Sequence, residues 1–334
     1  MPRSLIVMPD DSVKPFLDAI SGATKSLRIK MFLFSDPSLL KAVIDAHRRG
    51  VNVRVMLNPA RRDGESENKE SHKQLAAAGI EVIDSNPAYD VTHEKSMIVD
   101  DTTAFVNSLN LDTKNLTATR DYAVVTSHAH EVAEISECFE ADWHRKPFQG
   151  NEHSHLIWCG GNGRERIAQF IDGAKDSIFL QNERYQDAVI IERLIRAARR
   201  GVKVHVMVRP PHKLKKGKLV EEVGGMRSMH DVGIKIHKLK HLKLHAKMLL
   251  ADNARAIVGS INLAPGSFDS RRELAIEVDD DHVIKRLMKI AHHDWEHSHP
   301  LDLTDEGLFE EFKKHKMKEP EGLALKAMAK SAKR

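Results

Sequence analysis

Two histidine–lysine pairs are the residues of this sequence best suited to chemistry. His93 precedes Lys95 and His245 precedes Lys247, each time with one residue between them. A neutral imidazole is a good nucleophile near pH 7, its protonated form is a good acid, and an ammonium group stabilises developing negative charge. Two such pairs meeting at one phosphorus could cleave a phosphodiester, so we expect neither a metal ion nor another cofactor.

The residues that follow each pair repeat with identical spacing. The first copy continues with Asp100, Asn107, Ser108 and Asn110, and the second with Asp252, Gly259, Ser260 and Asn262. An acid stands eleven residues after each asparagine, as Asp121 and as Glu273. We expect the hydroxyl and amide groups to surround the phosphate and the two aspartates that follow the lysines to brace turns.

This pattern, His-x-Lys-x4-Asp-x6-Gly-Ser-x-Asn in two copies, resembles that of the phospholipase D superfamily. The resemblance covers nearly the whole chain and departs from the family at Asn107, where glycine is usual. If that position needs a positive φ, asparagine is the least costly replacement. The resemblance implies a covalent phosphohistidine: one histidine attacks phosphorus, and the other protonates the leaving alcohol and then activates water or an acceptor alcohol. We assign the attack to His93 and the acid and base role to His245.

The resemblance also implies roles for the surrounding residues. Asp121 and Glu273 look like the acids that orient the imidazoles through the second ring nitrogen. Asp100, Asp252, Asn107 and Gly259 are expected to support the motif. The candidate catalytic residues are therefore His93, Lys95, Ser108, Asn110, Asp121, His245, Lys247, Ser260, Asn262 and Glu273.

The chain is an internal duplication. The segment RRGVNVRVMLNP at 48–59 returns as RRGVKVHVMVRP at 199–210, shifted by 151 residues and identical at eight of twelve positions. We expect one phospholipase D-like unit at 1–150 and a second at 151–300. A basic extension at 301–334 would follow, in which residues 313–334 could form a basic amphipathic helix or, as the alternative, a frayed solvated tail.

Strand and helix patterns alternate within each unit. In the first, strands are expected at 5–8, 27–34, 51–55, 80–83, 93–99 and 103–106, and helices at 13–23, 37–49 and 71–78. On the strand at 93–99, His93 and Lys95 would leave the same face. The expected fold is an α/β fold of two mixed-sheet units, packed with pseudo-twofold symmetry around one active site.

Composition restricts the partners. No apolar run approaches the roughly 20 residues that span a bilayer, and the apolar run at 5–8 is shorter than the core of a secretory signal. A cytoplasmic protein, peripheral to the inner membrane face, is therefore expected. The net charge of +4 and the basic stretches at 213–218 and 237–247 suit an anionic lipid surface or a polyanion. Both motifs lie in one chain, so we expect a monomer.

A phospholipid is the expected substrate, because residues 262–278 resemble those of synthase-type members such as cardiolipin synthases. The alternative is a metal-independent nuclease, which the basic stretches favour. The histidines at 292, 293, 297 and 299 raise a metal alternative, since His293 and His297 are one helical turn apart. No further ligand at a recognisable spacing completes that site, so a solvated cluster is the preferred interpretation.

Overall fold

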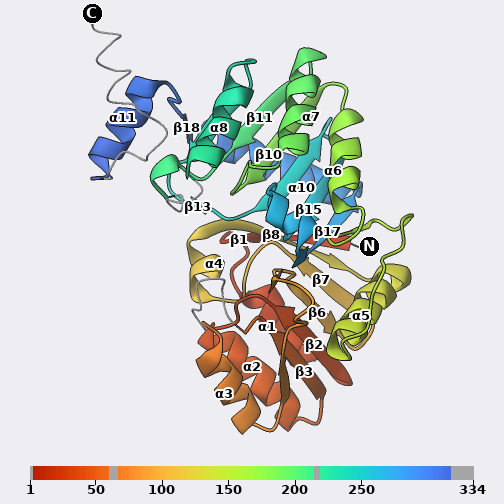
Figure 1. Cartoon of the computed structure of the whole chain (residues 1–334). Helices are drawn as coiled ribbons and strands as arrows, with labels where there is room; N and C mark the ends of the chain where they lie inside the picture. The colour runs from red at the N-terminus through yellow and green to blue at the C-terminus, as the bar shows by residue number, and fades with distance from the viewer. Residues whose placement is uncertain (1–2, 60–66, 214–218, 317–334) are drawn as a thin grey trace, which may run out of the picture.

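Two mixed sheets form the centre of the molecule and lie one above the other (Figure 1). The computed structural model describes residues 3–59, 67–213 and 219–316. The expected tail helix falls largely outside these residues, as does the basic stretch at 214–218. The two sheets confirm the predicted duplicated α/β fold, and the expected boundaries at 150 and 300 stay a prediction.

The first half of the chain builds the lower sheet. Its strands, in spatial order, are β1 (Arg3–Met8), β8 (Thr119–Thr126), β7 (Thr103–Asn107), β6 (Ser96–Val99), β2 (Ser26–Met31), β3 (Asn52–Leu57) and β4 (Glu81–Asp84). The strands β2, β3 and β4 are parallel, and the remaining neighbours are antiparallel. The predicted strands all occur, with ends shifted by a few residues.

The second half repeats this order. Its strands are β9 (Leu156–Trp158), β17 (Leu274–Val278), β15 (Arg255–Gly259), β14 (Lys247–Ala251), β10 (Ser177–Asn182), β11 (Lys203–Met207) and β12 (Lys235–Leu239), with β18 (Ser298–Pro300) added at the edge. Apart from β18, each of these strands has a counterpart at the same place in the first sheet, as a duplication requires.

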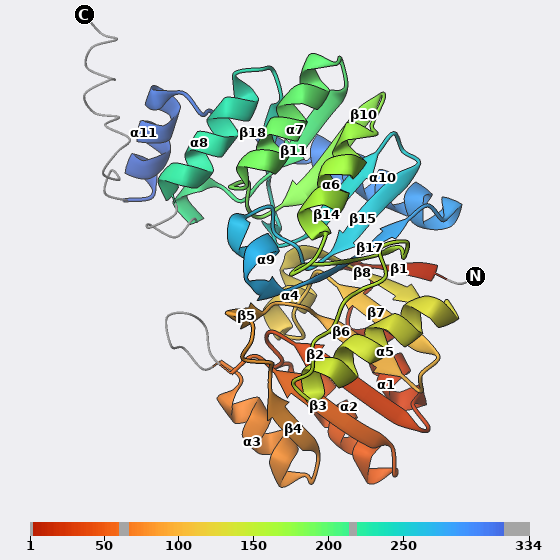
Figure 2. The same ribbon diagram turned by 45° about the vertical axis from the view of Figure 1, so that its right-hand side comes forward.

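Helices cover the outer faces of both sheets and also lie between them (Figure 2). In the first half they are α1 (Lys14–Gly22), α2 (Pro37–Arg48), α3 (Lys69–Ala77), α4 (Thr113–Thr117) and α5 (Ala129–Trp143). In the second half they are α6 (Gly163–Asp172), α7 (Ala188–Arg199), α8 (Leu219–His230), α9 (Pro265–Asp269), α10 (Asp281–Glu296) and α11 (Asp305–Lys314), with a 3-10 turn at η1 (Pro211–Lys213).

The repeated segment has the same helix cap and the same glycine turn in both halves. Asp36 caps α2 by accepting from the backbone N–H of Ser38 and Leu39, and Asp187 caps α7 in the same way. Just past the helices, Gly50 and Gly201 have φ values of +93° and +92°, which only glycine adopts at little cost. The two turns therefore direct β3 and β11 back into their sheets.

A shared apolar core joins the halves. Val106 and Val124 from the lower sheet belong to one buried cluster with Val258 and Ile276 from the upper sheet. The strands β15 and β17 pack against β7 and β8. The halves thus fold onto each other through buried apolar surface, the dominant stabilising term in such a contact.

Two short strand pairs cross between the halves. The strand β5 (Val91–Thr92) runs parallel to β16 (Arg271–Arg272), and β13 (Lys243–Leu244) runs parallel to the start of β8. In each pair, one strand ends directly before a motif histidine, and the paired residues of the other end directly before the acid of the other half. The first pair precedes His93 and Glu273, and the second precedes His245 and Asp121. The backbone itself therefore brings the two motifs to one seam.

Candidate active site

His93 lies outside the observed strand that corresponds to the one predicted at 93–99, and His245 lies likewise before its strand. The strand β6 begins at Ser96, so His93 and Lys95 precede it, and His245 precedes β14. The cause is the crossing backbone. The N–H of His93 donates to the carbonyl of Arg272 at 2.9 Å, and the N–H of Ala246 donates to the carbonyl of Arg120 at 2.9 Å. These bonds take the histidine segments out of their own sheets and toward the opposite half.

Each imidazole is held by an acid of the opposite half. His93 Nδ1 lies 2.9 Å from Glu273 Oε2 and 3.2 Å from the Ser260 carbonyl oxygen, and His245 Nδ1 lies 2.9 Å from Asp121 Oδ1. All these partners are acceptors, so Nδ1 carries a hydrogen in both rings. The lone pair of neutral His93 is therefore on Nε2, the nitrogen available for attack.

The two serines bond to the acids and not to a phosphate position. Ser108 Oγ donates to Asp121 Oδ1 at 2.6 Å, and Ser260 Oγ donates to Glu273 Oε2 at 2.6 Å. Both serines are fully buried. In this structure the serine hydroxyls bind the acids and position them, and a direct role of these hydroxyls at the phosphate stays a prediction.

The two lysines are buried beside the histidines. Lys95 Nζ donates to the His93 carbonyl at 2.6 Å, and Lys247 Nζ donates to the His245 carbonyl. Burial lowers the pKa of Lys95 to about 7, and the neighbouring Lys247 adds to this shift. Burial also places the pKa of His93 well below 6.5, and the charge of Lys95 acts in the same direction. His93 is therefore neutral at pH 7.

The acids differ between the halves. Burial raises the pKa of Glu273. Burial also acts against the charge of Asp121, but His245 and Lys247 outweigh it and lower the pKa of that carboxyl. The two histidine–acid pairs are therefore alike in geometry and unlike in electrostatics.

One cavity of about 860 Å³ contains both histidines in its wall. Asn110 and Asn262 line it as well, and the Oδ1 atom of each is buried without a partner among the described residues. Buried polar atoms without partners are rare in proteins. The two amides thus mark a place where a polar ligand or water completes the site.

The two aspartates of the motif bind the backbone of the neighbouring strand. Asp100 accepts from the backbone N–H of Thr24, Lys25 and Ser26, and Asp252 accepts from those of 175–177. Each aspartate therefore ties the hairpin that follows the motif lysine to the strand beside it.

The glycine position is not explained by a positive φ. Neither Asn107 nor Gly259 has one. A Cβ atom on Gly259 would instead lie 2.4 Å from Ala275 Cα and 2.4 Å from the Leu274 carbonyl oxygen. The expectation about φ is thus corrected: the close approach of β17 excludes a side chain at Gly259.

Two residues that the sequence analysis missed break the symmetry of the site. The repeat offset of 151 residues puts Phe32 and Glu183 at equivalent positions, and both line the cavity. The Phe32 ring lies 5.1 Å from the His93 ring, measured between centroids, and Lys95 Nζ lies 5.3 Å from the Phe32 centroid. Glu183 instead binds Lys247 at 3.0 Å. Aligning the two halves of the sequence would have shown that Phe32 and Glu183 differ. Neither residue belongs to the repeated His-x-Lys motif, so the motif alone does not point to them.

Comparison with known proteins agrees with this geometry. A family model described as "Cardiolipin synthase, PLD-like domain" matches residues 16–143 and again residues 167–295. The chain belongs to the phospholipase D-like family. Cardiolipin synthase B of Salmonella typhi is 24% identical to this phospholipase D-like chain over 312 residues, which cover 79% of this chain and 73% of the synthase.

Relatives with other names share the phospholipase D-like fold. Polyphosphate kinase of Vibrio parahaemolyticus is 25% identical over 302 residues. The match covers 84% of this chain and 42% of the kinase, so the chain spans about two fifths of that relative's length. The structure of phosphatidylserine synthase from Haemophilus influenzae matches with a TM-score of 0.69 at 10% identity, over 98% of this chain and 93% of the synthase. This last likeness shows a common fold.

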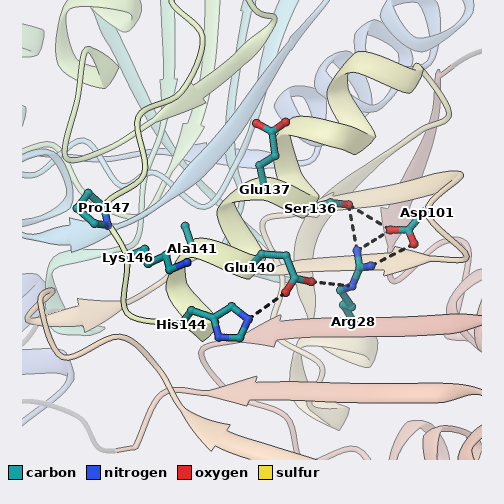
Figure 3. Close-up of a pocket in the computed structure, with 9 residues that line it drawn as sticks. All are labelled: Arg28, Asp101, Ser136, Glu137, Glu140, Ala141, His144, Lys146 and Pro147. Carbon is teal, nitrogen blue, oxygen red and sulfur yellow. Dashed lines mark hydrogen bonds and ion pairs between the residues drawn. The ribbon is translucent and has the colours of Figure 1, made fainter.

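A second hollow lies against α5, with a wall that includes His144 but neither of the motif histidines (Figure 3). It has a volume of about 390 Å³. Arg28 lies in it between Asp101, at 2.5 Å, and Glu140, at 3.3 Å. Arg28 is thus paired with two of the acids in the wall, and we assign this hollow no role in the chemistry.

Groups of three metal-ligand residues occur twice in the described part of this phospholipase D-like chain. One is Glu94, Cys138 and Asp142, and the other is His212, Glu311 and His315. The ammonium group of Lys30 binds both acids of the first group, at 3.0 and 2.8 Å. In the run at 292–299, the rings of His293 and His297 lie 4.2 Å apart.

None of the described helices is both long enough and apolar enough to cross a bilayer.

Proposed function

We propose that this chain is a phosphodiesterase or phosphatidyltransferase of the phospholipase D type that acts on phospholipids through a covalent phosphohistidine. The observation that carries this proposal is the crosswise pairing of each imidazole with an acid of the other half, at one shared cavity. Such pairing presents two Nε2 atoms with fixed tautomers, which a two-step displacement at phosphorus requires.

In the first step His93 attacks. Its Nε2 lone pair forms a bond to phosphorus while the bond from phosphorus to the leaving alcohol breaks, and His245 Nε2–H gives its proton to that alcohol. Burial and, after it, the nearby cations lower the pKa of His93 and keep the ring neutral, and Phe32 packs against it. His245 has a carboxylate near each ring nitrogen, Asp121 at 2.9 Å and Glu183 at 3.8 Å, so both ring nitrogens face an acid when the ring acts as the proton donor.

In the second step neutral His245 takes a proton from water or an alcohol, whose oxygen attacks phosphorus as the bond to His93 breaks. Both histidines return to their initial states. Lys95 and Lys247 stabilise the charge on the phosphoryl oxygens in both steps, and the amides of Asn110 and Asn262 hold those oxygens in place.

Phospholipid is the substrate class with the most support. The matching family model carries the cardiolipin synthase description, and cardiolipin synthase B is similar over most of its own length. Lys114, Lys213 and Lys243 line the cavity and are exposed. Exposed cations at the entrance suit docking on an anionic membrane face. We expect the protein to act as a monomer at the cytoplasmic face of a membrane.

Nucleic acid is the second candidate, because the same cations could follow a phosphate backbone. Arg184, Arg209 and Arg271 add to the positive wall of the cavity. The polyphosphate kinase relatives make a polyphosphate chain a further polyanion to include in any test.

A substrate panel tests the proposal. Purified protein is incubated with vesicles of phosphatidylglycerol and phosphatidylethanolamine and, in parallel, with single-stranded DNA, duplex DNA and polyphosphate, with and without EDTA. We expect turnover of a phospholipid that persists in EDTA and disappears in His93→Ala. Cleavage of DNA alone would establish the second candidate, while loss of activity in EDTA and its rescue by zinc or magnesium would contradict the mechanism.

A further inference from the structure

Glu183 is a buried anion in a site that must bind a phosphate anion. It directly follows β10, and its side chain is 10% exposed. Its Oε2 lies 3.0 Å from Lys247 Nζ, and its Oε1 lies 3.0 Å from a guanidinium nitrogen of Arg209. A carboxylate repels phosphate, so its presence in the cavity wall calls for a ligand other than the phosphoryl oxygens.

The position of the carboxylate relative to His245 identifies that ligand. Glu183 Oε2 lies 3.8 Å from His245 Nε2, the nitrogen that Asp121 leaves available. This separation is too long for a direct hydrogen bond. Two hydrogen bonds of about 2.8 Å that meet at one oxygen atom span about 4.6 Å at the tetrahedral angle and roughly 4 Å at 90°, so the observed separation accepts a bridging oxygen with a narrowed angle. An oxygen carrying two hydrogens therefore fits between the two groups.

Among the described residues, the opposite side of the reaction centre offers no such position. Phe32 stands at the place of Glu183 and packs its ring against His93. An aromatic ring accepts no ordinary hydrogen bond from water or a hydroxyl group. The attacking oxygen is thus held beside His245, and the phosphoryl group is carried by His93.

We propose that Glu183 and His245 form an acceptor-binding position for water or a vicinal diol, on one side of the site only; this inference rests on the function proposed above. In the second step a water molecule gives one hydrogen to His245 Nε2 as a proton and keeps its other hydrogen bonded to Glu183. Its oxygen forms the new bond to phosphorus, and the bond from phosphorus to His93 Nε2 breaks.

The number of hydrogens makes the position selective. A monohydric alcohol has one hydroxyl hydrogen, which the base must take, so nothing remains for Glu183. A vicinal diol such as glycerol supplies the second hydrogen from its neighbouring hydroxyl group. Glu183 therefore favours water and glycerol-type acceptors over simple alcohols.

The competing explanation is that Glu183 serves only as the counter-ion of Lys247 and Arg209. In that case the function of Glu183 depends on its negative charge and not on its ability to accept a hydrogen bond from the acceptor. Glu183→Gln removes the charge and keeps an accepting oxygen, whereas Glu183→Leu removes both. The two explanations therefore predict different behaviour for this pair of variants.

The experiment is an acceptor competition with the full chain. Phosphatidylethanolamine vesicles, and a nitrophenyl phosphodiester as a second donor, are incubated with equal concentrations of glycerol and ethanol, and the water, glyceryl and ethyl products are quantified. We expect Glu183→Leu to raise the ratio of ethyl to glyceryl product about fivefold, the factor for one hydrogen bond. Glu183→Gln should stay within about twofold of the wild-type ratio, since its amide oxygen still accepts. Phe32→Leu, the matched control, should leave the ratio unchanged even if its rate differs.

An unchanged ratio in Glu183→Leu, or equal ratios in both Glu183 variants, would overturn the inference. Failure of the proposed function would look different: the wild-type protein would then form no phosphohistidine and no acceptor product with either donor. Circular dichroism of each variant, together with retained phosphohistidine formation, checks that a changed ratio does not reflect misfolding.

Discussion

Lys95 is a buried ammonium group whose charge is easily lost. Its pKa of about 7 means that the group is charged below pH 7 and neutral above it. If the charge stabilises the phosphoryl oxygens, kcat/KM falls as the pH rises through about 7. An arginine stays protonated at all these pH values. We expect Lys95→Arg to have a lower maximum and no such alkaline fall, and pH–rate profiles of both proteins measure this. An alkaline limb that stays in place in the variant would assign it to another group.

The two histidines should differ in covalent labelling. With a nitrophenyl phosphodiester, whose leaving group needs little protonation, His245→Ala should accumulate a phosphohistidine, because attack by His93 survives and the base for the second step is missing. His93→Ala should accumulate none. Mass spectrometry of the trapped protein locates the label, and the stability of phosphohistidine to base separates it from phosphoserine. A label on His245 in His93→Ala would reverse the two roles.

At the scale of the elements, the packing of β15 against β17 sets what the motif tolerates. A Cβ atom at Gly259 would meet backbone atoms at 2.4 Å, so we expect Gly259→Ala to lower the free energy of unfolding by roughly 1–3 kcal/mol. The first half already accommodates a side chain at Asn107, opposite Ala123. Its amide is buried without a partner among the described residues, so Asn107→Ala should cost less than about 1 kcal/mol. Urea denaturation compares the two, and equal losses would contradict this account.

Most elements could be predicted because their signals are local. Proline at the start of α2 and glycine just past its end gave its limits within a residue of the observed Pro37–Arg48. The histidine segments were assigned wrongly to strands because their backbone partners, such as Arg272, are about 180 residues away. The serine contacts and the roles of Phe32 and Glu183 escaped for the same reason. The spacing of the motif was enough to predict which residues form the site. Their individual roles depend on contacts between the two halves, which the sequence does not show.

At the scale of the whole molecule, two buried arginines clamp the halves together. Arg120 binds Asp294 through two nitrogens, at 2.8 and 2.9 Å, and Arg272 binds Asp142 through two, both at 3.0 Å. Each pair joins one half to the other. Removing one partner of a buried ion pair leaves an uncompensated charge and costs about 3–5 kcal/mol.

We therefore expect Asp142→Asn to lower the free energy of unfolding by about 3–5 kcal/mol at pH 7. Asp172→Asn is the control, because it breaks a surface pair with Arg193 and should cost less than about 1 kcal/mol. The folded-state pKa of Asp142 is about 2, below the unfolded value near 3.9. Its contribution is therefore present above pH 4 and is lost as the pH falls toward 2. Urea titrations at pH 7 and pH 3 should show the two proteins converging, and an undiminished difference in acid would argue against the clamp.

The crosswise acids also constrain how such a chain could have arisen. A half-length ancestor could orient its histidine only with the acid of a second copy, so it had to pair with itself before it could catalyse anything. In that symmetric pair every substitution would have appeared on both sides of the phosphate at once, and a phenylalanine facing a glutamate could not exist. Joining the two copies in one gene removed this restriction. The difference between Phe32 and Glu183 is therefore a mark of divergence after fusion, through which the two walls of a symmetric site became different.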